Sequence, residues 1–276
     1  MQRKLSAVGW VLVLLAPAAA GALDINGFFP AAGSGAVALS ATSESYDEFW
    51  VGTTKVSDPG VGEVEIRSLT LWLTWGLSDR LALIVNLPHV DADSDGLGGF
   101  GDSGLQDLTL LAKYQFAASE TSGGRHRFLG AAGVRTPASS YEGNLPVDLG
   151  DATTDALLRF VYQFERGGFY FSQQVGYDVR GDDAPDGFPL ATELGYTHRR
   201  VTYTALVSLY SADGGTDIGD PGFTFPSNRD EYLRVGAKVY GRFTERLGGT
   251  LGAFTTLDGR NSGDLSGAFG GVVWSF

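Results

Sequence analysis

The chain alternates apolar and polar residues with a period of two, in successive segments of about ten residues from position 67 onward, as membrane barrel strands do. Residues 105–116 (LQDLTLLAKYQF) are an example, with Leu108, Leu110, Ala112, Tyr114 and Phe116 in one set and Asp107, Thr109, Lys113 and Gln115 in the other. Side chains at this period lie on opposite faces of a β-strand. These segments lack the i, i+3, i+4 pattern of an amphipathic helix, and the alternation therefore predicts strands with one apolar and one polar face.

Twelve such strands are expected, and the connections between them differ in a regular way. The strands are predicted at 35–50, 64–77, 81–90, 105–117, 126–136, 154–165, 169–180, 188–198, 201–211, 230–243, 247–257 and 264–276. Tight turns such as 78–80 (SDR) alternate with longer connections rich in Asp and Gly, such as 212–229. Up-and-down outer-membrane barrels have this asymmetry, with short periplasmic turns and longer outer loops. We therefore predict an all-β, antiparallel transmembrane barrel.

A closed barrel accounts for the apolar faces better than a soluble β-sandwich, which is the alternative fold. In lipid no sheet edge can be left unpaired, so a dozen strands must close on themselves. Aromatic residues also gather at the predicted short-turn ends on the apolar phase, namely Trp75, Phe116, Phe164, Phe169, Phe243, Trp274 and Phe276. A sandwich does not require its strands to end in aromatics, whereas a barrel places them at the membrane interface.

The first residues of the chain predict export, and the last residues predict assembly into a membrane. Arg3 and Lys4 precede a short apolar core and alanines at A-x-A spacing, which predicts a signal peptide over residues 1–22. Residues 23–34 then form a periplasmic segment or a plug, two alternatives that the sequence leaves open, and residues 35–276 form the barrel. At the other end Val272, Trp274 and Phe276 share one face, as in the signal read by the barrel-assembly machinery. The predicted location is the outer membrane of a Gram-negative bacterium, among its lipids.

Four stretches resemble one known family. They are 76–90 (GLSDRLALIVNLPHV), 101–116 (GDSGLQDLTLLAKYQF), Arg135-Thr136-Pro137 and 260–276 (RNSGDLSGAFGGVVWSF). Together they are similar to the outer-membrane family named for the MetA pathway of phenol degradation. The resemblance implies an outer-membrane barrel that transports small molecules, with a link to aromatic compounds. It carries no catalytic or binding residues that can be transferred to this chain.

Charged residues on the inward phase are the candidate functional set. The residues predicted to line the lumen are Asp107, Lys113, Arg159, Gln163, Asp178, Arg180, Glu193, Arg234, Lys238 and Arg242. Such side chains set ion selectivity in a pore, or they fill a closed lumen with ion pairs. The whole chain holds 20 basic against 32 acidic residues, a net charge of −12. This balance excludes nucleic acid as a partner, because phosphate binding needs a basic excess.

The sequence also bears on two other kinds of site, a calcium-binding loop and a serine hydrolase site. Residues 91–102 (DADSDGLGGFGD) match a calcium-binding loop at Asp91, Asp93, Asp95 and Asp102, although Asp stands where Glu is usual and no helices flank the loop. The alternative is an acidic hairpin loop without a metal, and no other cofactor is expected. Three histidines and no G-x-S-x-G motif argue against a serine hydrolase.

The predicted function is passive passage of small molecules through an outer-membrane barrel, with aromatic or hydrophobic compounds as candidate substrates and no enzymatic activity. The alternative is a non-conducting surface barrel whose acidic loops bind cations, envelope lipid or a protein partner. The sequence does not decide between an open and a filled lumen.

Overall fold

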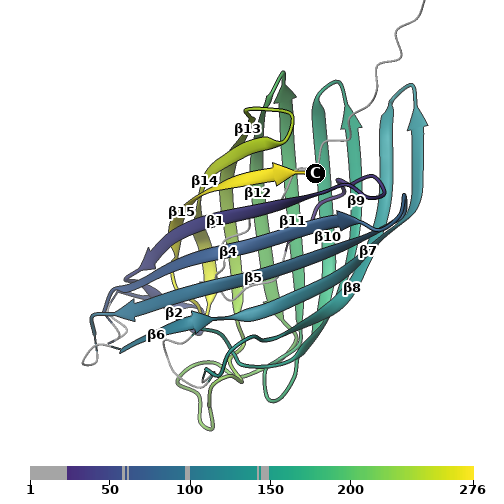
Figure 1. The fold of residues 1–276 in the computed structure, drawn as a ribbon. Coiled ribbons are helices and arrows are strands. Elements are labelled where there is room, and N and C mark those ends of the chain that lie inside the picture. The colour runs from purple at the N-terminus through teal and green to yellow at the C-terminus, as the bar shows by residue number, and fades with distance from the viewer. Residues whose placement is uncertain (1–23, 58–59, 61, 97–99, 142, 144–148) are drawn as a thin grey trace, which may run out of the picture.

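Twelve long antiparallel strands form the closed wall of a barrel in the computed structural model, which describes residues 24–57, 60, 62–96, 100–141, 143 and 149–276 (Figure 1). The wall strands are β1 (Gly35–Tyr46), β4 (Val64–Gly76), β5 (Leu81–Ser94), β7 (Asp107–Thr121), β8 (Gly124–Pro137), β9 (Asp155–Arg166), β10 (Phe169–Val179), β11 (Gly187–His198), β12 (Val201–Ala212), β13 (Glu231–Arg242), β14 (Leu247–Arg260) and β15 (Ser266–Ser275). Three shorter strands complete the fold: β2 (Phe49–Val51), β3 (Thr54–Val56) and β6 (Phe100–Leu105).

The barrel closes between its first and last strands. β1 pairs with β15 from Ala36↔Ser275 to Ser45↔Ser266, and with β4 along its other edge. Gly35 and Phe276 then exchange two backbone hydrogen bonds of 3.0 Å, which continue the ladder to the end of the chain. Because every wall strand has a neighbour on both sides, the barrel has no open edge, as a sheet in lipid requires.

The alternation in the sequence becomes the two faces of this wall. Along β9, the apolar Leu158 and Phe160 are 52% and 43% exposed on the outside, whereas Arg159 and Gln163 are 4% and 0% exposed on the inside. Six of the seven aromatics predicted to lie at the membrane interface are exposed: Trp75, Phe116, Phe169, Phe243, Trp274 and Phe276. Phe164 is half-buried. An outer apolar surface bordered by aromatics is the surface that lipid covers in a membrane barrel.

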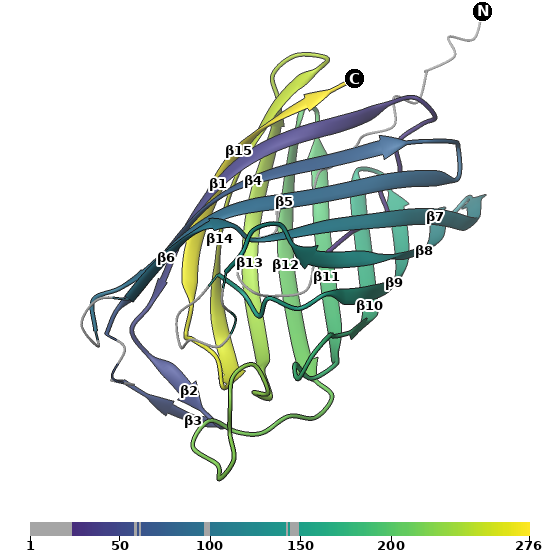
Figure 2. The ribbon, with the colours of Figure 1, turned by 60° about the horizontal axis from the view of Figure 1, so that its bottom comes forward.

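Short turns gather at one end of the barrel and long connections at the other, as predicted. The C-terminus lies at the short-turn end, at the top of Figure 1, and the long loops lie at the bottom (Figures 1 and 2). Gly167 and Gly168, which join β9 to β10, have φ values of +59° and +91°. Two consecutive positive φ angles are what a tight hairpin turn needs to match the twist of its strands, and glycine adopts them without strain.

The structure corrects two predicted boundaries on the loop side. The first strand ends at Tyr46 rather than at residue 50, and the small hairpin β2–β3 follows it, apart from the wall (Figure 2). β5 continues to Ser94 instead of ending at residue 90, and it pairs with β6. Asp and Gly had indicated a loop there. Alternation persists, however, with Val90 and Ala92 buried and Asp91 and Asp93 exposed, so the strand extends beyond the apolar band.

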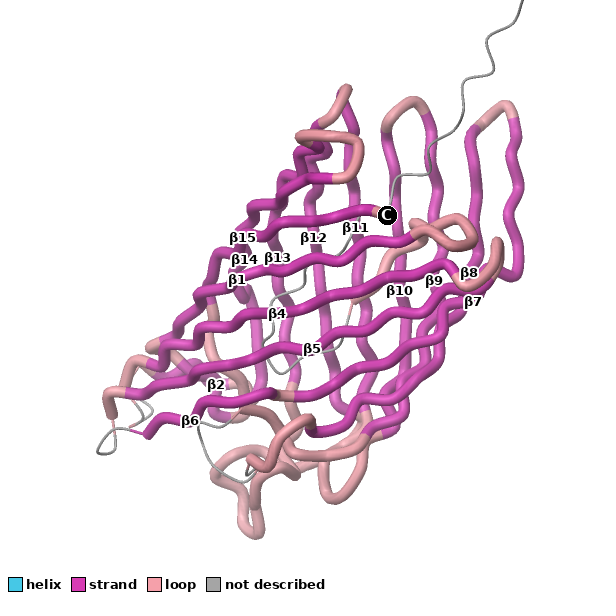
Figure 3. Tube along the Cα trace, in the orientation of Figure 1, coloured by secondary structure: helices cyan, strands magenta, loops and turns pink. Residues whose placement is uncertain are grey.

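The described part of the chain consists of strands and connecting loops (Figure 3). Among these residues, no helix is long and apolar enough to cross a membrane. The predicted signal peptide, residues 1–22, lies outside the described residues.

Candidate functional site

Residues 24–30 precede the first strand and lie inside the barrel; we call them the lumen segment. Ile25 and Phe28 are 3% and 8% exposed and belong to the same buried cluster as inward-facing Trp72, Leu129 and Phe269. The ring of Phe28 meets Tyr170 of β10 edge-on, with centroids 4.9 Å apart. The chain between this segment and β1 is exposed at the short-turn end, where Gly33 donates a 2.8 Å backbone hydrogen bond to Gly76.

The barrel wall binds the lumen segment mainly through its backbone. The amide of Ile25 donates to Gln174 Oε1 at 2.7 Å, and the amide of Gly27 donates to Gln163 Oε1 at 2.8 Å and to Ser172 Oγ at 3.3 Å. In the other direction, Lys113 Nζ donates to the carbonyls of Phe28 and Asn26 at 2.6 and 3.3 Å. Arg127 Nη1 donates to the carbonyl of Gly27 at 3.2 Å. We call these five wall residues, Lys113, Arg127, Gln163, Ser172 and Gln174, the seat.

Glu193 on β11 connects the lumen segment to β13. Lys238 Nζ lies 2.9 Å from Glu193 Oε1, and the two side chains are 2% and 6% exposed. Asn26 Nδ2 and the Tyr170 hydroxyl both donate to Glu193 Oε2, at 3.2 and 3.1 Å. A buried carboxylate needs both an opposite charge and hydrogen-bond donors. Glu193 has the Lys238 ammonium as its opposite charge and Asn26 and Tyr170 as further donors.

Arg159 and Asp178 form a second buried pair, on the neighbouring strands β9 and β10. Both side chains are 0% exposed, and Arg159 Nη2 donates to Asp178 Oδ2 at 3.2 Å beside a second, shorter bond from Nη1. Gly176 stands opposite Arg159 in the sheet, and a Cβ at that position would overlap the Arg159 side chain. Glycine at 176 thus makes room for the guanidinium to turn along the wall.

A larger group of charges lies toward the loop end. Arg135 Nε donates to Asp155 Oδ2 at 2.9 Å and lies 4.0 Å from Asp107, while Arg180 pairs with Asp151 and lies 3.6 Å from Asp155. These bridges link β7, β8 and β9 to Arg180, which follows β10, and through Arg180 to the loop that precedes β9. Asp107 also accepts a hydrogen bond from Tyr141 in that loop.

The basic triplet predicted on β13 divides into three environments. Lys238 is the partner of Glu193, whereas Arg234 stacks over Tyr232 at 4.1 Å and donates from Nε to Thr256 Oγ1 at 3.3 Å. Arg242 is half-buried near the short-turn end. The structure therefore brings Lys113 and Gln163 together at the seat and pairs six of the other predicted residues in ion pairs. Arg234 instead contacts Tyr232 and Thr256.

Among the lumen residues that sequence reasoning missed are Arg127, Ser172, Gln174 and Glu44. All four follow the inward phase of their strands, so the alternation was the signal that could have found them. Glu44 is 4% exposed, and neither of its carboxylate oxygens has a hydrogen-bond partner among the described residues. The predicted lumen residues all lie on β7 or later in the chain, and none lies on β1.

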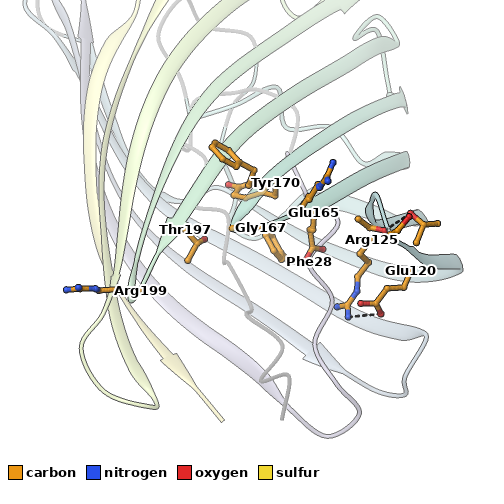
Figure 4. A pocket seen from close by; sticks show the side chains of 14 residues that line it. Phe28, Glu120, Arg125, Glu165, Gly167, Tyr170, Thr197 and Arg199 are labelled. Carbon is orange, nitrogen blue, oxygen red and sulfur yellow. Dashed lines mark hydrogen bonds and ion pairs between the residues drawn. The ribbon is translucent and has the colours of Figure 1, made fainter. Parts of the chain in front are cut away.

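A recess of about 490 Å³ opens beside the lumen segment at the short-turn end. Phe28 and Tyr170 line its inner part, and the turn at Gly167 lies at its rim (Figure 4). Arg125 and Glu120, 3.3 Å apart, form an ion pair on one side, whereas the side chain of Arg199 points away from the recess. Phe28 is therefore the part of the lumen segment nearest to this mouth.

The acidic stretch 91–102 forms a hairpin. Asp91 and Asp93 lie on β5 and Asp102 on β6, with Ala92 opposite Asp102 in the register; residues 97–99 lie outside the described residues. Within the described ranges, no group of three His, Cys, Asp or Glu residues is placed to hold a metal ion.

Among the histidines, His126 Nδ1 lies 2.9 Å from the Tyr162 hydroxyl.

Asn261 joins three outer loops. Its side chain accepts hydrogen bonds from the amides of Gly52 and Ile218 at 2.8 and 3.1 Å, and donates to Asp217 and to the carbonyl of Arg229, both at 2.9 Å. Arg260 adds two 2.7 Å hydrogen bonds to Asp217. The hydrogen bonds from Arg260 and Asn261 lower the pKa of Asp217 to about 2.

Residues 52–269 match the model of the family described as "Putative MetA-pathway of phenol degradation". The chain belongs to this phenol-degradation family. The match covers β3, the wall from β4 onward and part of β15, and it agrees with the resemblance found in the four sequence stretches. A comparison with curated protein sequences finds no match.

Solved structures share the fold of this phenol-degradation family member at low sequence identity. The COG4313 outer membrane channel from Pseudomonas putida F1 is 16% identical, with a TM-score of 0.73, over 95% of this chain and 100% of that one. The NanC porin is 8% identical, with a TM-score of 0.54, over 86% and 98%. The translocator domain of the autotransporter NalP from Neisseria meningitidis is 12% identical, with a TM-score of 0.52, over 88% of each chain.

Proposed function

We propose that the protein is an outer-membrane channel for the passive passage of small molecules, in which the lumen segment controls the width of the path. The observation that carries the proposal is the backbone binding of residues 25–28 inside a closed barrel. We further propose that the chain is exported by its first 22 residues and inserted by the barrel-assembly machinery. Membership of the phenol-degradation family and the channel named among the similar folds support this function.

In this mechanism the wall residues bind the lumen segment and solutes move when it shifts. Each buried hydrogen bond of the seat contributes about 0.5–1.5 kcal/mol, so several weak bonds hold the segment in its place inside the barrel. A shift toward the recess beside Phe28 keeps the ion pairs of the wall intact, because Arg159 and Asp178 bind each other and not the segment. Phenols are the first solutes to test, since the family description names phenol degradation.

The second candidate is a non-conducting barrel. The buried pairs Lys238–Glu193 and Arg159–Asp178 favour it, because they fill part of the interior with compensated charges. The acidic outer loops would then bind a cation, envelope lipid or a protein partner.

A variant of the lumen segment separates the two functions. A Cβ at Gly27 would overlap the Cβ of Gln163, an atom fixed to β9, so Gly27→Val must displace the segment. Ala32→Val is the matched control, since Ala32 is exposed outside the lumen segment. In planar bilayers we expect Gly27→Val to conduct at least several-fold more than the wild type and Ala32→Val to equal it. Phenol flux into liposomes should rise in the same order. Folded protein that passes neither ions nor phenol in any variant would refute the channel and leave the second candidate.

A further inference from the structure

The seat binds the lumen segment mainly through the peptide groups of the segment and less through its side chains. Over residues 25–28 it accepts from two amides and donates to three carbonyls, with six hydrogen bonds between 2.6 and 3.3 Å. Side chains add fewer contacts. Ile25 is buried among apolar residues, and Phe28 meets the ring of Tyr170. Within the seat, Gln174 Nε2 donates to Asp24 Oδ1 at 3.3 Å and Lys113 lies over the ring of Phe29. The recognition is therefore that of a short stretch of polypeptide.

The geometry of the wall explains why peptide groups fit. In the sheet Gln163 lies opposite Ser172, so Gln163 and Gln174 are diagonal neighbours on the inner face of β9 and β10. Diagonal positions in an antiparallel pair lie about 7–8 Å apart. From these two positions the glutamine oxygens accept from the alternate N–H groups of Ile25 and Gly27, where the chain bends at Gly27.

The seat also needs a partner of this chemistry. Lys113, Gln163, Ser172 and Gln174 are each at most 3% exposed. A buried donor or acceptor that loses its partner is destabilised by its full desolvation free energy. An apolar molecule in place of the segment would leave the Lys113 ammonium and both glutamine oxygens unsatisfied, whereas another peptide would satisfy them.

We propose that the seat is a peptide-binding site, which takes from solution a short peptide with glycine at the position of Gly27 whenever the chain's own segment is displaced. The proposal rests on the displaceable lumen segment of the proposed function, but it does not require that the barrel conduct. The peptide enters from the short-turn end, where a recess lined by Phe28 and Tyr170 opens beside the lumen segment. Glycine is required because any Cβ at that position would overlap Gln163.

The test uses the full-length Gly27→Val protein, folded in detergent, and the acetylated, amidated peptide Asp-Ile-Asn-Gly-Phe-Phe, which copies residues 24–29. Titration calorimetry should show binding to Gly27→Val that is at least tenfold tighter than to the wild type, whose seat is filled. The matched control peptide is methylated on the Ile and Gly amide nitrogens and should bind about tenfold more weakly, because it lacks the two donors. Gln174→Leu in the Gly27→Val background should weaken binding of the unmethylated peptide.

Equal binding of the two peptides, or no binding to Gly27→Val, would overturn the proposal. If Gly27→Val does not fold, Asn26→Asp displaces the segment by another route, since it sets a carboxylate against Glu193, 3.2 Å away. The readout also separates this proposal from the channel. Peptide binding by a barrel that passes no current would refute the channel alone, whereas current without peptide binding would refute the peptide site alone.

Discussion

Gln163 and Gly27 lie 136 positions apart in the chain, yet Gln163 Oε1 accepts a 2.8 Å hydrogen bond from the Gly27 amide inside the barrel. Gln163 is completely buried and stands on β9, whose backbone is held by hydrogen bonds on both edges. The same side chain that binds Gly27 leaves no room for a larger residue there. One rigid position of the wall thus sets both the attachment and the depth of the lumen segment.

The Lys238–Glu193 pair should stabilise the barrel. Lys238→Met leaves the buried Glu193 carboxylate with only Asn26 and Tyr170, so we expect the free energy of unfolding to fall by about 3–5 kcal/mol. Urea unfolding in lipid vesicles, followed by tryptophan fluorescence, measures this change. The double variant Lys238→Met, Glu193→Gln removes the unpaired charge and should recover at least half of the loss. A single variant within about 1 kcal/mol of the wild type would contradict a buried, compensated pair.

The ties among the outer loops should weaken in acid. The pKa of Asp217 is lowered to about 2 by hydrogen bonds from Arg260 and Asn261. A carboxylate with a lowered folded pKa stabilises above its ordinary pKa, near 3.8, and its contribution is lost as the pH falls through about 2. Carbon-13 NMR of labelled aspartates should show Asp217 titrating near 2 in the wild type and nearer to 4 in Arg260→Met. An unchanged titration in Arg260→Met would show that the pair does not hold the carboxylate.

Phe276 closes the backbone ladder with Gly35 and packs against Trp274, with ring centroids 5.3 Å apart. Deleting it removes two hydrogen bonds at the seam and the terminal aromatic of the predicted assembly signal. We expect several-fold less protein in the outer membrane, with the remainder periplasmic or degraded, as measured by fractionation and immunoblotting. Phe276→Tyr keeps the aromatic and the backbone bonds and should insert normally. Wild-type membrane yield of the deletion would argue against a role for this residue in assembly.

The closed ladder should also resist detergent. Every wall strand is paired on both edges, so local opening has no free edge from which to spread. Folded protein should keep its compact form in SDS at room temperature and change its gel mobility on boiling. Circular dichroism should show sheet with little helix. Complete unfolding in SDS without heating would be inconsistent with a closed wall.

The period-two pattern predicted most of the wall because it is a local property of the chain. Leu158 and Arg159 are adjacent in sequence, and the pleat alone sends one outward and the other inward. The same reasoning located the strands from β7 to β15 within a few residues and identified the short-turn end. It was wrong for Asp91 and Asp93, which lie on a strand, because Asp and Gly near a barrel rim resemble loop residues.

The partners of the inward side chains were decided only by the tertiary structure. Phase places Lys238 and Glu193 inside, but their contact across 45 positions depends on how the strands are staggered when the barrel closes. The lumen segment shows the same limit. Residues 24–30 have no alternation, so their sequence was equally compatible with a plug and a periplasmic tail. Their place depends on the side-chain oxygens of Gln163 and Gln174, which come together only when β9 and β10 pair. These hydrogen bonds join residues that are far apart in the chain, so no single strand determines them.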